Sequence, residues 1–71
     1  MHNNIEFLRH SLTLEEIETI KSIIKTVDSE SKFTLLRDFF HNPLIFNKIK
    51  DIVDPTWLAY DIFINIHHYE F

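Results

Sequence analysis

Apolar residues recur at every third or fourth position along most of the chain, which is the spacing of one face of an α-helix. The residues between them are mostly Glu, Lys, Ser and Asn. The pattern predicts four helices, over residues 13–27, 29–41, 43–53 and 55–69. The side chains expected to face the core in the first three are Ile17, Ile20, Ile24 and Val27, then Phe33, Leu36, Phe39 and Phe40, then Ile45, Ile49, Ile52 and Val53.

The predicted helix starts coincide with capping residues. Thr13 and Glu16 form a capping box, in which each side chain accepts a hydrogen bond from the other residue's backbone amide. Side chains that can cap a helix also begin the other three helices, and two of them precede proline: Asp28-Ser29, Asn42-Pro43 and Asp54-Pro55. A weaker box, Asn3 with Glu6, predicts a short additional helix within residues 1–10.

The helix predicted over residues 55–69 is apolar around most of its circumference. A helical wheel places its polar residues in one narrow stripe, formed by Asp61, Asn65 and His68. Three short amphipathic neighbours can cover only part of such a helix. We therefore expect it to contribute surface for a homodimer. In the alternative, this helix is the central one and only its polar stripe is exposed.

The composition is typical of a small folded domain. Apolar residues make up 45% of the 71 residues, which is too many for a disordered segment. Glycine is absent, which argues against tight hairpin turns and glycine-rich phosphate loops. Cysteine is also absent, so the core must form by packing alone. We expect one compact four-helix all-α domain over residues 1–71.

The charge balance bears on partners and location. Eleven acidic residues against seven basic ones give a net charge of -4, which opposes attraction to nucleic acid or anionic lipid. Polar residues interrupt the first ten positions, so no secretory leader is expected. The longest apolar runs, residues 57–60 and 62–64, are far shorter than the ~20 residues that a membrane helix needs. We expect a cytoplasmic protein with no membrane partner.

Two groups of residues raise the question of chemistry at a metal or catalytic site. His67, His68 and Glu70 cluster late in the chain, but neighbouring helical side chains point about 100° apart and are not expected to converge on one ion. Asp38 and His41 are three residues apart and could pair as an oriented base, yet no nucleophile motif accompanies them. We expect no metal, no cofactor and no enzymatic activity.

A helix-turn-helix is the main alternative, because only a short break separates residues 29–41 from residues 43–53. The second of these helices would offer Asn47, Lys48 and Lys50 to a DNA groove. The other basic residues are scattered, and the net charge has the wrong sign for DNA.

By elimination, the sequence favours a small protein-binding module that acts as a regulator, inhibitor, immunity-type factor or accessory subunit. Its aromatic residues are suitable anchors for an interface. Early acidic residues could steer a basic partner. The candidate binding residues are Trp57, Tyr60, Phe63, Ile64, Glu15 and Glu18. A DNA-binding regulator ranks second, and an enzyme or ligand carrier with a hidden site ranks third.

Overall fold

The computed structural model describes residues 5–26 and 28–69. This part of the chain is all-helical, as predicted, and its Cα radius of gyration of 11.0 Å equals the about 11 Å expected of a compact chain of this length. It contains five α-helices rather than four, because the short N-terminal helix is present as α1. The elements are α1 Ile5–Ser11, α2 Leu14–Ile24, α3 Ser29–His41, α4 Pro43–Ile49, α5 Pro55–Ile64 and a 3₁₀ helix Ile66–His68.

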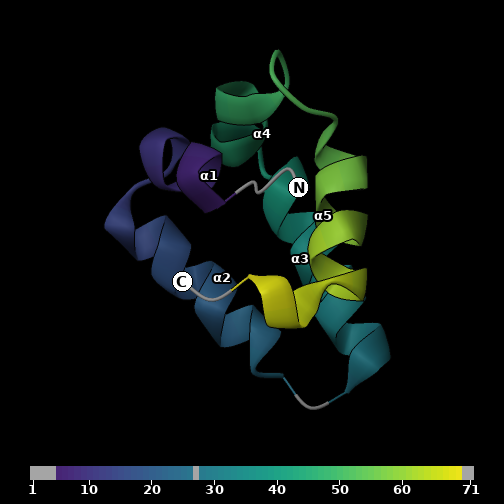
Figure 1. Cartoon of the computed structure of the whole chain (residues 1–71). Helices are drawn as coiled ribbons and strands as arrows, with labels where there is room; N and C mark the ends of the chain where they lie inside the picture. Colours follow the sequence, from purple (N-terminus) through teal and green to yellow (C-terminus); the bar gives the residue numbers. More distant parts are fainter. Residues whose placement is uncertain (1–4, 27, 70–71) are drawn as a thin grey trace.

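Helix α3 is at the centre of the arrangement. Its most extensive contact is with α5, and it also packs against α2 and α4. Figure 1 shows α1 and α2 on one side of the molecule and α5 on the other. All five α-helices contribute to one hydrophobic core, whose largest fully buried side chains are Leu8, Ile20, Leu36, Phe40, Ile49, Leu58 and Ile62.

Each predicted cap in the described residues is formed. In the capping box the Thr13 amide donates to Glu16 Oε1 at 2.8 Å, and the Glu16 amide donates to Thr13 Oγ1 at 3.2 Å. Three further side chains accept a hydrogen bond from a first-turn amide of the helix that follows, namely Asp28, Asn42 and Asp54. The Asn3 box lies outside the described residues.

Three helices end earlier than predicted, whereas α3 has the predicted bounds. Helix α2 ends at Ile24, and α4 ends at Ile49 in a turn. Helix α5 ends at Ile64 because Asn65 leaves helical geometry, with φ of -116° and ψ of 35°. Within residues 5–26 and 28–69, no helix is long and apolar enough to cross a membrane.

The predicted core positions are confirmed in part. Six are buried, namely Ile17, Ile20, Leu36, Phe40, Ile45 and Ile49. Four are only half-buried, namely Ile24, Phe33, Phe39 and Val53, and Val27 lies outside the described residues. Ile23, which was not predicted, is buried instead of Ile24. The prediction that Ile52 is buried is wrong. Its side chain is 66% exposed, because α4 ends at Ile49 and Ile52 lies in the turn that follows.

Candidate functional site

Helix α5 buries one side and exposes apolar residues on the other. Leu58, Ala59 and Ile62 are fully buried. On the opposite side, three large apolar side chains spaced three and four residues apart are each about half exposed: Trp57 at 48%, Tyr60 at 52% and Ile64 at 51%. The described part of the chain therefore leaves one apolar side of α5 in contact with solvent.

The predicted polar stripe of this helix is not its exposed side. Asp61 and Asn65 are half-buried, and Asn65 Nδ2 donates to Asp61 Oδ1 at 3.2 Å. The hydroxyl of the buried Tyr69 donates to Asp61 Oδ2. His68 belongs to the 3₁₀ helix that follows. The alternative in which only the stripe is exposed is therefore wrong, because Trp57, Tyr60 and Ile64 are about half exposed while Asp61 and Asn65 are half-buried.

An aromatic cluster extends this surface from α5 onto α3. The Phe33 ring centroid lies 5.3 Å from that of Phe63 and 6.3 Å from that of Tyr60, the second pair being edge-to-face. The Arg37 guanidinium carbon lies 5.9 Å from the Phe33 centroid. We call Phe33, Trp57, Tyr60, Phe63 and Ile64 the aromatic face. Four of its five members were candidate residues from the sequence, and Phe33 was assigned to the core instead.

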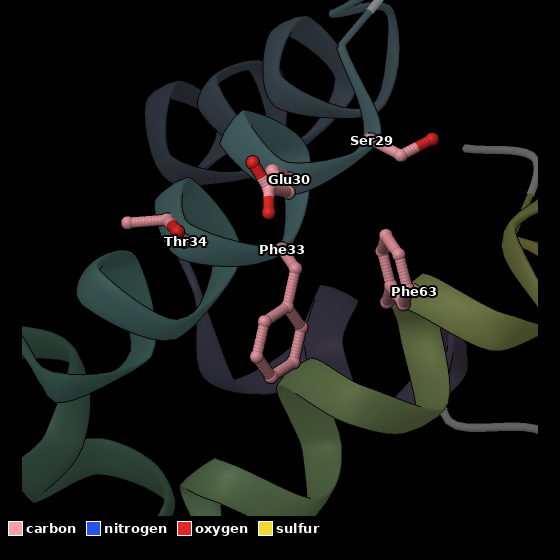
Figure 2. Close-up of a pocket in the computed structure, with 5 residues that line it drawn as sticks. All are labelled: Ser29, Glu30, Phe33, Thr34 and Phe63. Atoms are coloured by element: carbon pink, nitrogen blue, oxygen red, sulfur yellow. The ribbon is translucent and has the colours of Figure 1, made fainter.

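A hollow of about 510 Å³ adjoins the aromatic face at the amino end of α3. It is lined by Ser29, Glu30, Phe33, Thr34 and Phe63. Figure 2 shows the Phe33 ring from α3 and the Phe63 ring from α5 on two sides of this space, with Glu30 above Phe33. Sequence reasoning missed the hollow, because nothing in the spacing of Phe33 and Phe63 indicates that α3 and α5 bring them together.

The acidic candidates lie elsewhere. Glu15 and Glu18 are exposed on α2, and Glu18 Oε2 accepts a hydrogen bond from Lys21 Nζ at 3.1 Å. Figure 1 shows α2 on the side of the molecule away from α5. The structure therefore does not bring these two residues together with the candidate residues of α5.

Asp38 and His41, which the sequence placed close enough to pair, each have another partner in the structure. His41 Nε2 lies 2.8 Å from Thr56 Oγ1, which ties the end of α3 to the start of α5. Asp38 Oδ1 lies 3.9 Å from Arg37 Nε. The His41 contact therefore helps to position α3 against α5.

The residues proposed to read DNA are exposed on α4 and just after it, but one is already engaged. Lys48 Nζ donates to Glu16 Oε1 on α2 at 2.8 Å. A lysine held by a carboxylate must give up that bond to reach a phosphate or a base. This contact weakens the support for a helix-turn-helix function.

The histidine cluster is closer than helix geometry predicts. The His67 and His68 ring centroids lie 4.3 Å apart, with their planes tilted by 42°. Glu70 lies outside the described residues. Over residues 5–26 and 28–69, no group of three or more His, Cys, Asp or Glu side chains is placed to hold a metal ion.

The fold and this site define the class as an all-α protein with an exposed aromatic face. Comparison of the chain with protein-family models, curated proteins and solved structures finds no match. Function is therefore inferred from the residues of this chain.

Proposed function

We propose that this protein binds another protein through the aromatic face. The observation that supports the proposal most is the half-exposed row of Trp57, Tyr60 and Ile64 on one side of α5. Single exposed apolar residues are ordinary on protein surfaces, whereas a contiguous apolar patch commonly marks an interaction site. Trp and Tyr are also the side chains that most often anchor interfaces.

The size of the aromatic face indicates what kind of complex it can form. An aromatic side chain buries ~150–250 Å² when fully covered. The partly exposed side chains of the aromatic face therefore have about a few hundred Å² of accessible surface left to bury. This is less than the ~800 Å² that each partner buries in a standard interface. A stable complex must also cover polar residues around the face, such as Arg37 and Glu30. These proportions suit a small regulator, inhibitor, immunity-type factor or accessory subunit that acts through one partner.

The test compares three baits in affinity capture from the organism that encodes the chain, followed by mass spectrometry. The baits are the wild type, the face variant Tyr60→Gln/Ile64→Gln, and the control Leu14→Gln/Leu44→Gln. The control removes two apolar side chains that are 78% and 74% exposed on α2 and α4 and do not belong to the aromatic face. Circular dichroism first establishes that all three baits fold.

The proposal expects at least one protein, in stoichiometric amount, to be retained by the wild type and the control and lost from the face variant. Retention of the same proteins by all three baits would show that the aromatic face is not the binding surface.

A further inference from the structure

The hollow beside Phe33 and Phe63 has the chemistry of a site for a positively charged side chain. Two of the described residues that line it, Phe33 and Phe63, are aromatic, and Glu30 is the charged residue among them. A cation is attracted to the face of an aromatic ring and to a carboxylate. Phe33 already has a guanidinium within 5.9 Å, that of Arg37.

Arg37 does not occupy the hollow. It lies one helical turn after Phe33 on α3, whereas Glu30, which lines the hollow, lies almost one turn before Phe33. Arg37 is not among the residues that line the hollow. A second cation could approach the Glu30 side without displacing Arg37.

The amino end of a helix carries a partial positive charge of about +0.5, which opposes a cation. At this end of α3, the carboxylates of Asp28 and Glu30 oppose that charge, whereas Lys32 adds to it. Asp28 Oδ2 accepts hydrogen bonds from the Ser31 hydroxyl at 2.7 Å and from the Ser31 amide at 2.9 Å. These two bonds lower the pKa of Asp28. Glu30 is the carboxylate that lines the hollow itself.

We infer that the hollow of Ser29, Glu30, Phe33, Thr34 and Phe63 receives a Lys or Arg side chain from the protein that covers the aromatic face. This inference rests on the proposed function and specifies the chemistry of the partner. The partner segment combines apolar side chains, which cover Tyr60 and Ile64, with a basic side chain that enters the hollow. The net charge of -4 favours the same kind of partner, because opposite charges steer association.

The experiment titrates the isotope-labelled protein with three synthetic 14-residue peptides and follows the reaction by NMR. All three peptides place leucines along one helical face, and their remaining positions are all Lys, all Gln or all Glu. We expect the Lys peptide to bind most tightly and to shift the resonances of Phe33, Phe63 and Thr34. We expect Glu30→Gln to lower the affinity for the Lys peptide by about two- to fivefold at low salt, which is the effect of losing one exposed ion pair.

Glu15→Gln is the matched control, because it removes the same charge from exposed α2. We expect it to leave the affinity unchanged. Equal effects of Glu30→Gln and Glu15→Gln would overturn the inference, as would binding of the Gln peptide as tightly as the Lys peptide. In either case, shifts at Tyr60 and Ile64 would leave the proposed function standing. If no peptide perturbed Tyr60 or Ile64, the result would count against the aromatic face itself.

Discussion

Lys48 on α4 donates a hydrogen bond to Glu16 Oε1 on α2 at 2.8 Å, across 32 residues of sequence. The same oxygen accepts the Thr13 amide of the capping box, also at 2.8 Å. One carboxylate therefore fixes the start of α2 and ties that start to α4. Desolvation acts to raise the pKa of Glu16, but the hydrogen bonds from Lys48 and Thr13 and the Lys48 charge outweigh it, and the net shift is downward.

The first prediction compares the two interactions of the Glu16 carboxylate, the capping box with Thr13 and the hydrogen bond from Lys48. Thr13→Ala removes the cap and should lower the free energy of unfolding by ~1 kcal/mol. Lys48→Met removes only the link to α4 and should cost about 0.5 kcal/mol, because the pair is partly exposed. Lys50→Met, at an exposed position two residues later, is the control. Urea denaturation measures all three, and an unchanged midpoint for Thr13→Ala would mean that the box does not stabilise α2.

The second prediction concerns acid. Glu16 and Asp28 both have lowered pKa values in the folded protein. Their ionised forms therefore stabilise the fold fully above the unfolded pKa values of about 4.3 and 3.9, and this contribution is lost as the pH falls through the lower folded values. We therefore expect the urea concentration at the unfolding midpoint to decrease as the pH is lowered below about 4.5.

Glu16→Gln/Asp28→Asn tests the assignment of this acid sensitivity, because both amides can still accept the capping hydrogen bonds without titrating. The variant should show a flatter dependence of the midpoint on pH than the wild type. Glu15→Gln, which removes a neighbouring exposed carboxyl, controls for net charge. Parallel curves for the wild type and the double variant would assign the sensitivity to other groups.

The third prediction separates the two sides of α5 with one kind of substitution. Ile62 is fully buried and Ile64 is 51% exposed on the same helix. Ile62→Val should lower the free energy of unfolding by ~0.5–1.5 kcal/mol, the cost of one buried methylene with its cavity. Ile64→Val should change it by less than about 0.5 kcal/mol. Thermal and urea denaturation are the measurements, and equal losses would mean that Ile64 is covered in solution.

Local signals in the sequence predicted where helices begin. Thr13, Asn42 and Asp54 each act within a few residues of chain, so their hydrogen bonds need no knowledge of the fold. Helix ends were less predictable. Apolar residues continue past Ile49 and Ile64, and the periodic pattern therefore extended both helices into segments that turn away.

The candidate site was predictable only on α5 itself. The excess of apolar residues on that helix indicated surface left uncovered, and Trp57, Tyr60 and Ile64 are exposed. Which side would be exposed depended on Asp61, whose polar partners include Tyr69, eight residues away. The hollow depended on the packing of Phe33 from α3 against Phe63 from α5, a long-range contact that helical periodicity does not encode.

The last prediction is that the protein self-associates weakly when no partner is present, through the aromatic face. Apolar burial favours a dimer, whereas a net charge of -4 on each copy opposes it. Because salt screens that repulsion, added salt should strengthen the dimer, although it should weaken binding of a basic peptide. Sedimentation equilibrium at micromolar concentrations tests this against the monomer mass of 8.6 kDa.

Tyr60→Gln/Ile64→Gln should abolish the rise in mass, and Leu14→Gln/Leu44→Gln should preserve it. Trp57 is the one tryptophan and lies on the aromatic face, so its fluorescence should change on dilution as the dimer dissociates. A monomeric mass at low and high salt, together with constant Trp57 fluorescence, would exclude self-association through α5.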